Sequence, residues 1–151
     1  QLLRSLMWPA SFEQRLHAWG VLRESIQHAS LPQTLQEINT WWFRTPWRAY
    51  HLHWDDRANW PDPWELLAEN TYCTVARALG MCYTLLLTGE KDIELVEATD
   101  KTGDDVVLVL VDNAKYILNY WPDTVISNTL NDFKVVDKLD IKKIIDKIGK
   151  I

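Results

Sequence analysis

The sequence predicts an α+β fold, and a change of hydrophobic pattern near the middle of the chain carries that prediction. Up to Leu87, apolar residues recur at spacings of three and four, as in amphipathic helices. Beyond Gly89 they gather in short apolar, largely β-branched runs between turn residues, which indicates strands. Helices followed by neighbouring strands favour a helical half packed on a small antiparallel sheet. The 151 residues show no repeat or linker, so we expect a single domain, 1–151.

Helices are expected in order from Ser11. Ser11 and Gln14 match a capping box. The helix that they begin is expected to end at Ala29-Ser30, with an apolar stripe of Phe12, Leu16, Trp19, Leu22 and Ile26. A second helix should run from Pro32 to Pro46, and its inner side consists of Leu35, Ile38, Trp41 and Trp42.

Two further helices should precede the strands. Asp62 is placed to cap a short helix over Trp64–Leu67, with Pro63 in its first turn. Asn70 or Thr71 can cap the next helix, which reaches Leu87 and is apolar at most positions. That density predicts a buried central helix.

Strands are expected at Ile93–Ala98, Val106–Val111 and Lys115–Leu118, and Phe133–Val136 is a further candidate. Turns should separate them at Thr102–Asp105 and Asp112–Ala114. The Val106–Val111 run is apolar throughout, so both of its faces should be buried.

The two ends of the chain carry separate expectations. The first ten residues, 1–10, are apolar for a free terminus and could form an arm that docks on a neighbouring subunit. Residues 137–151 are predicted to form a C-terminal helix, centred on Asp140 to Ile148.

Composition narrows the classes of function. A net charge of -5 argues against nonspecific binding to nucleic acid. No segment is apolar for long enough to cross a bilayer and no signal peptide is evident, so we expect a soluble protein. Cys73 and Cys82 would stand about 13 Å apart on one helix, too far for a disulfide. No cofactor motif is evident.

The nine tryptophans are concentrated in the first half of the chain. Such a cluster forms either an aromatic core layer or a contact surface, and the helical pattern favours the core. Any binding surface would include those that prove exposed among Trp41, Trp42, Trp47, Trp54, Trp60 and Trp121.

Cys73 stands near the start of the central helix, after a loop rich in Trp and Pro, as the nucleophile of a cysteine hydrolase does. All four histidines precede it in sequence: His17, His28, His51 and His53. His51 or His53 could serve as a rearranged base, or pack among the tryptophans or reach solvent. Together with Asp55 and Asp56 they also suggest a metal cluster, but alternate residues of a strand point to opposite faces. No metal site is therefore predicted.

In order and spacing, several segments resemble the bacterial transglutaminase-like cysteine proteinases, which belong to the papain-like group. Asn59–Leu67 resembles the segment before the nucleophile, and Thr71–Val75 the segment that contains it. Asp105–Leu110 and Tyr116–Tyr120 resemble the two strands that bear the family's His and Asp. The resemblance implies a papain-like or transglutaminase-like fold in which a Cys-bearing helix packs on an antiparallel sheet.

The resemblance also implies roles for three positions. Cys73 matches the nucleophile, Asp105 stands where the general base His belongs, and Asn119 stands where the orienting Asp belongs. Thr74-Val75 replaces the acidic residues that bind calcium in the family. A carboxylate cannot take and return a proton near neutral pH as imidazole does, so the catalytic triad is expected to be non-functional.

We therefore expect a catalytically inactive domain that acts as a structural or interaction protein with protein partners. A phage virion or another large assembly is the hypothesised setting, by analogy with other reused hydrolase domains. The alternative is an active cysteine peptidase or acyltransferase that uses Cys73. A third hypothesis is a binding groove in the old active-site cleft, and the residues expected to bind are Trp60, Trp64, Tyr72 and Trp121.

Overall fold

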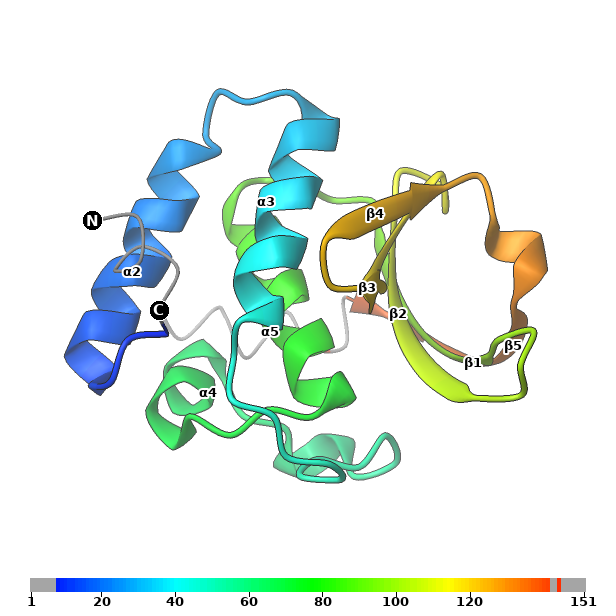
Figure 1. Ribbon diagram of the computed structural model, residues 1–151, viewed down its shortest axis with the longest axis horizontal. Helices are drawn as coiled ribbons and strands as arrows, with labels where there is room; N and C mark the ends of the chain where they lie inside the picture. The colour runs from blue at the N-terminus through cyan, green and yellow to red at the C-terminus, as the bar shows by residue number, and fades with distance from the viewer. Residues whose placement is uncertain (1–7, 142–143, 145–151) are drawn as a thin grey trace.

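The structure is a computed structural model that describes residues 8–141 and residue 144. Figure 1 shows two layers, with helices α2 to α5 on one side and a curved antiparallel sheet on the other. The predicted α+β class is confirmed. None of the described helices has both the length and the apolar content needed to cross a bilayer.

The outer helices are α2 (Phe12–Ser25) and α3 (Leu31–Phe43). The capping box of Ser11 and Gln14 is confirmed, and Ser30 caps α3. The predicted apolar stripe of α2 is wrong at its first two positions, because Phe12 and Leu16 are 37% and 36% exposed. Arg15 is buried there instead and donates hydrogen bonds to the carbonyls of Leu67, Pro9 and Ala10.

The inner helices are α4 (Pro63–Glu69) and α5 (Thr74–Leu87). Asp62 caps α4 as predicted. The predicted cap of α5 at Asn70 or Thr71 is wrong, because Asn70 closes α4 in a left-handed conformation and Cys73 is the N-cap of α5. The α5 helix is buried along most of its length, which confirms it as the central helix.

The sheet has the strand order β4-β3-β2-β1-β5, and all of its neighbouring strands are antiparallel. Its strands are β1 (Ile93–Thr99), β2 (Asp105–Val111), β3 (Tyr116–Trp121), β4 (Thr124–Ser127) and β5 (Lys134–Asp140). The sequence patterns did not indicate the short strand β4. Between β2 and β3, Asp112, Asn113 and Ala114 all have positive φ and form the expected turn.

The C-terminal end of the chain differs from expectation, whereas most of the expected N-terminal docking arm lies outside the described residues. The predicted C-terminal helix over 137–151 is wrong in its first part, because Asp137–Asp140 belongs to β5 and pairs with β1. Residues 142–143 and 145–151 of that helix lie outside the described residues. So do residues 1–7 of the predicted docking arm, while Trp8 packs on Trp41 of the same chain.

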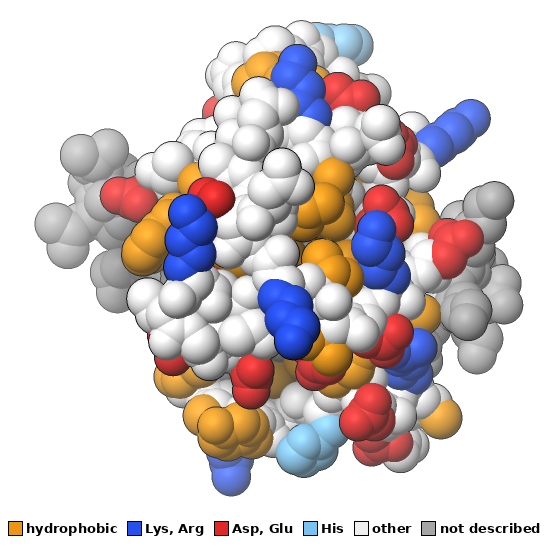
Figure 2. Space-filling view, turned by 90° about the vertical axis from the view of Figure 1, so that its right-hand side faces the viewer, with side chains coloured by type: hydrophobic (Ala, Val, Ile, Leu, Met, Phe, Trp, Pro, Cys, Tyr) orange, Lys and Arg blue, Asp and Glu red, His pale blue; other side chains and the backbone are white. Residues whose placement is uncertain are grey.

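Strand β2 separates two apolar cores. Val107, Val109 and Val111 face the helices and join the main core. Leu108 and Leu110 face away from the helices into a smaller core with Ile117. The burial of both faces of this strand is therefore confirmed. On the face of the molecule shown in Figure 2, apolar side chains are visible only in small areas, among charged residues of both signs.

Most tryptophans are buried, which confirms the core interpretation. The buried ones are Trp19, Trp41, Trp42, Trp54 and Trp60. Trp47 and Trp121 differ from them, because they are 54% and 51% exposed. Both exposed rings lie at the same hollow of the surface.

Candidate functional site

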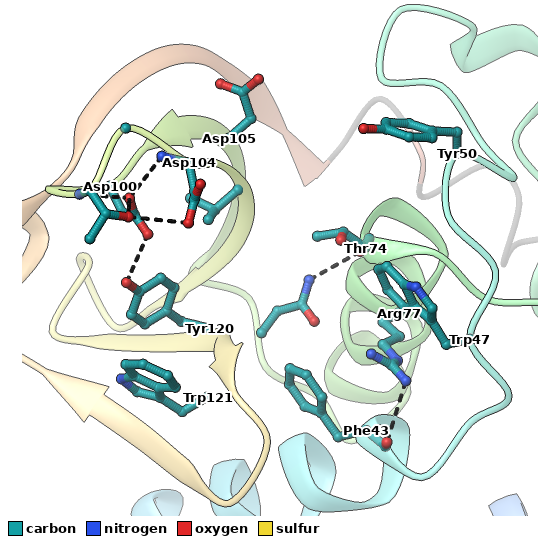
Figure 3. A pocket seen from close by; sticks show the side chains of 14 residues that line it. Phe43, Trp47, Tyr50, Thr74, Arg77, Asp100, Asp104, Asp105, Tyr120 and Trp121 are labelled. Atoms are coloured by element: carbon teal, nitrogen blue, oxygen red, sulfur yellow. Dashed lines mark hydrogen bonds between the residues drawn. The ribbon is translucent and has the colours of Figure 1, made fainter.

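Two adjoining cavities lie between the start of α5, the loop over residues 44–56, and strands β2 and β3. The larger has a volume of about 790 Å³ and the smaller about 490 Å³. Both are lined by Trp47, Tyr50, Thr74, Asp105 and Val106. We refer to the two together as the cleft, and Figure 3 shows its larger part.

Cys73 lines the smaller cavity, but its side chain is almost wholly covered. The residue is 3% exposed, and its thiol is free of any disulfide. Its Sγ accepts a hydrogen bond from the N–H of Leu52 at 3.3 Å and lies 3.7 Å from the carbonyl of Leu52, to which it donates. The thiol is therefore engaged by main-chain groups of the loop.

Main-chain hydrogen bonds hold this loop against the start of α5. The N–H of Arg48 donates to the carbonyl of Tyr72 at 2.8 Å, and the N–H of Tyr72 donates to the carbonyl of Pro46 at 3.2 Å. Because Tyr72 directly precedes Cys73, these bonds fix the loop beside the thiol.

Asp105 and Asn119, the other two positions of the expected triad, lie in the same cleft. Asp105 is exposed at the start of β2 and lines both cavities. Asn119 is 5% exposed and lines the larger cavity. Its Nδ2 donates to the carbonyls of Thr74 at 3.0 Å and Val107 at 2.9 Å. Both of its donors are used by the main chain, so Asn119 is a structural bridge.

The backbone at Asn119 departs from regular strand geometry. Its φ is 73°, a left-handed conformation that asparagine tolerates better than most residues. The pairing of β3 with β4 is irregular between Ile117 and Trp121, and the N–H of Asn119 donates to Oδ1 of Asn39 at 2.8 Å. This bulge turns the Asn119 amide toward α5.

None of the four histidines, all of which are described, forms a hydrogen bond with Cys73. His53 lines the smaller cavity and is exposed. The Nε2 of His51 lies 3.3 Å from a carboxylate oxygen of Glu69. Among the described residues, no three His, Cys, Asp or Glu side chains are grouped so that they could hold a metal ion.

Of the four aromatic residues expected to bind, only Trp121 lines the cleft. Trp60 and Tyr72 are buried, with exposures of 3% and 0%, and Trp64 packs edge-on against Trp19. Trp60 and Tyr72 belong to the main core, and Trp64 is partly buried against it.

The cleft also presents Trp47, which was among the tryptophans expected to bind if exposed, and two aromatic residues, Phe43 and Tyr50, that the motifs did not single out. Phe43, Trp47 and Tyr50 line the larger cavity, together with Arg77. Tyr50 is 84% exposed and has a φ of 59°. The sequence carried no signal for this position, since neither its side-chain type nor its neighbours predict a left-handed turn.

Arg77 is the one Lys or Arg side chain among the described residues that line the cleft. Its guanidinium lies 4.9 Å from the ring centre of Phe43 and 4.8 Å from that of Trp47. It also donates to Oγ1 and the carbonyl of Thr45 and to the carbonyl of Phe43. Burial lowers the pKa of Arg77. This cation is thus largely satisfied within the protein.

Carboxylates dominate the rest of the cleft wall. They belong to Asp55, Glu97, Asp100, Asp104 and Asp105. Figure 3 shows three of them, Asp100, Asp104 and Asp105, across the cavity from Trp47 and Arg77. Hydrogen bonds, chiefly that from Thr102, lower the pKa of Asp100. Partial burial and the nearby carboxylates of Asp55 and Asp105 raise the pKa of Glu97.

No family model matches the sequence, and no curated protein matches it significantly. Solved structures of LapG from Legionella pneumophila are similar in fold. The calcium-bound form has a TM-score of 0.71 and 15% identity, covering 87% of this chain and 77% of that chain. The EGTA-treated form has a TM-score of 0.72 and 15% identity, covering 89% and 76%. A third LapG structure has a TM-score of 0.72 and 16% identity, covering 95% and 88%.

This likeness shows that the chain has the transglutaminase-like fold, which confirms the fold expected from the resemblance. At such low identity it shows the fold alone. The chemistry of the cleft has to be argued from the side chains that line it.

Proposed function

We propose that this chain is a catalytically inactive transglutaminase-like domain that binds protein partners through its cleft. The observation that carries the proposal is the state of Cys73, a residue that is 3% exposed and whose thiol is hydrogen-bonded to the main chain of Leu52. A nucleophile must reach its substrate and needs a base within hydrogen-bonding distance. Cys73 has neither access nor such a base among the described residues.

The side chains opposite Cys73 support the same conclusion. Asp105 lines the cavity where the resemblance expects imidazole. Carboxylates disfavour thiolates nearby and are poor proton donors to a leaving amine at neutral pH. Asn119 could orient a histidine in principle, but its amide already donates to Thr74 and Val107.

The binding part of the proposal rests on the aromatic side chains at the cleft. Trp47, Tyr50 and Trp121 expose 54%, 84% and 51% of their surface. Trp and Tyr are the residues that most often anchor protein partners. An open cleft of this size, with the exposed rings of Trp47, Tyr50 and Trp121 at its rim, suits a segment of a partner protein better than a fully enclosed small molecule.

An active cysteine peptidase or acyltransferase remains the second candidate, and one observation favours it. His53 lines the same cavity as Cys73, which itself caps the N-terminus of α5. A movement of the loop that carries Leu52 and His53 would be needed to uncover the thiol and bring an imidazole to it.

Labelling of Cys73 with iodoacetamide separates the two candidates. We expect Cys73 to be labelled slowly in the native protein and fast in urea. The variant His53→Ala should not change the rate of labelling in the native protein. Cys82 is an internal reference for a buried thiol, since it is 0% exposed and burial raises its pKa. Cys73→Ser identifies the labelled site. Fast native labelling at neutral pH that His53→Ala abolishes would overturn the inactive assignment.

A further inference from the structure

Building on the proposed binding function, we propose that the cleft takes an extended segment of a partner protein that is rich in arginine or lysine. This class of ligand is inferred from the shape of the cleft, from its exposed rings and from the sign of its charge.

Most of the exposed aromatic side chains of the described residues line this cleft. The exposed large apolar side chains in the described part of the chain are Phe12, Leu16, Val21, Trp47, Tyr50, Trp121 and Val136. All of the aromatic ones except Phe12 line the cleft. A gathering of exposed aromatic rings around a hollow marks a contact surface, because each ring left in water costs free energy that a partner recovers.

The negative charge of the cleft favours a positively charged ligand. The wall carries the five carboxylates named above, whereas Arg77 is the only Lys or Arg side chain on it among residues 8–141 and 144. Arg77 is held by Thr45 and stacked on Phe43 and Trp47, so it offsets little of the negative potential across the cavity. A concave site with one sign of charge attracts and orients the opposite sign.

Three of these carboxylates are free to contact a ligand. Asp55, Glu97 and Asp105 accept no side-chain hydrogen bond and form no ion pair among the described residues, whereas Asp100 accepts hydrogen bonds from Thr102, Tyr120 and Asp104. Asp105 lines both cavities, so it lies at the junction of the cleft. Partial burial raises the pKa of Glu97, and the nearby carboxylates of Asp55 and Asp105 raise it further, so a bound cation would relieve their mutual repulsion.

The distribution of the carboxylates favours an extended ligand with several cationic groups. They come from the loop before η1 (Arg57–Asn59), from β1, from the turn between β1 and β2, and from the first residue of β2. No three of them are grouped to hold one metal ion in the described part of the molecule. Guanidinium groups can pair with such spaced carboxylates and also stack on the Trp and Tyr rings at the rim.

The test uses the full chain and fluorescein-labelled peptides of alternating Arg and Ala, with Glu-Ala and Ser-Ala peptides for comparison, followed by fluorescence anisotropy. We expect the Arg-Ala peptide alone to bind. The double variant Asp105→Asn with Glu97→Gln should weaken this binding by about tenfold or more. The matched control, Glu24→Gln with Asp123→Asn, removes the same charges outside the cleft and should leave binding unchanged.

Each of the other outcomes would overturn the binding site, the basic ligand class or the inactive function. Equal weakening by the control pair would mean attraction to net charge, not to the cleft. Binding of the Ser-Ala or Glu-Ala peptide in place of Arg-Ala would overturn the basic class while leaving the binding function. No binding of any peptide would overturn the inference. Cleavage of the bound Arg-Ala peptide, seen by mass spectrometry and lost in Cys73→Ser, would instead refute the inactive function and leave the preference for basic segments.

Discussion

The side-chain amide of Asn119 donates a 3.0 Å hydrogen bond to the main-chain carbonyl of Thr74, the residue that follows Cys73. Its other amide hydrogen is donated to the carbonyl of Val107 at 2.9 Å. One side chain thus joins β3, β2 and the first turn of α5 at the base of the cleft. Its position matches an orienting carboxylate in the resemblance, but its contacts require an amide.

Replacement of this amide by a carboxylate, Asn119→Asp, should destabilise the fold. Aspartate has the same shape and also tolerates the φ of 73°. It would, however, turn a charged oxygen toward two carbonyl oxygens at a site that is 5% exposed. We expect a loss of about 3 kcal/mol in the free energy of unfolding at neutral pH, measured with urea.

Acidification provides the control for this variant. The buried carboxyl of Asn119→Asp would have a raised pKa in the folded state, so its penalty exists above that pKa and disappears below the pKa of the unfolded chain. The difference in stability between variant and wild type should therefore shrink as the pH falls. A variant as stable as the wild type at neutral pH would show that the two hydrogen bonds contribute little.

Much of the fold could be predicted from the sequence, because local patterns define it. The Ser11 and Asp62 caps follow from short capping motifs, and the inner side of α3 and the strand buried on both faces follow from the pattern of apolar residues. Strand β4 could not be predicted in this way, since it depends on pairing across an irregular part of β3. For the same reason the start of the predicted terminal helix belongs to β5, where pairing with β1 prevails over local helical pattern.

The cleft could be predicted only in part. Spacing and the family resemblance indicated Cys73, Asp105 and Asn119, which line adjoining cavities. The exposed rings of the cleft were predicted only in part: Trp47 and Trp121 were candidate binding residues, whereas Tyr50 was not, because the path of the loop over residues 44–56 decides which of its rings face water. Trp47 and Trp60 look alike in sequence, yet they are 54% and 3% exposed.

Thr84 is expected to be one of the most sensitive polar residues of the core. Its Oγ1 accepts hydrogen bonds from Nε1 of Trp19 at 2.9 Å and Nε1 of Trp42 at 3.0 Å, and donates to the carbonyl of Gly80 at 2.7 Å. Thr84→Val keeps the shape but leaves two buried indole N–H groups unpaired. We expect a loss of about 3 kcal/mol in urea unfolding, and a smaller loss of about 1 kcal/mol for Thr84→Ser, which keeps the hydroxyl. Equal losses for the two variants would indicate that packing, not hydrogen bonding, matters here.

Two helical glycines offer a matched pair of substitutions. A Cβ on Gly80 would lie 2.5 Å from ring atoms of Trp42, which is 1% exposed and has little room to move. A Cβ on Gly20 would meet no atom nearer than 3.8 Å, from Arg23. Gly80→Ala should therefore cost about 2 kcal/mol through overpacking between α3 and α5, whereas Gly20→Ala should stabilise the protein by about 0.5 kcal/mol. Stabilisation by both would show that α3 and α5 can separate freely.

Glu97 should show opposite effects on stability and on binding. Partial burial and the carboxylates of Asp55 and Asp105 raise its pKa, so its charged form is disfavoured in the folded state. Glu97→Gln should therefore raise the melting temperature at neutral pH while weakening binding of the Arg-Ala peptide. Glu24→Gln, an exposed change on α2, should do neither.

The pH dependence of the melting temperature tests whether the charge of Glu97 destabilises the fold. The penalty from Glu97 is present above its folded pKa and is relieved below its unfolded pKa, so the melting temperatures of Glu97→Gln and wild type should converge below about pH 4. Added salt should reduce the neutral-pH difference, because it screens repulsion between the partly exposed carboxylates. A lower melting temperature for Glu97→Gln at neutral pH would mean that Glu97 has a favourable partner in the fold, and its negative charge would then not be available to a ligand.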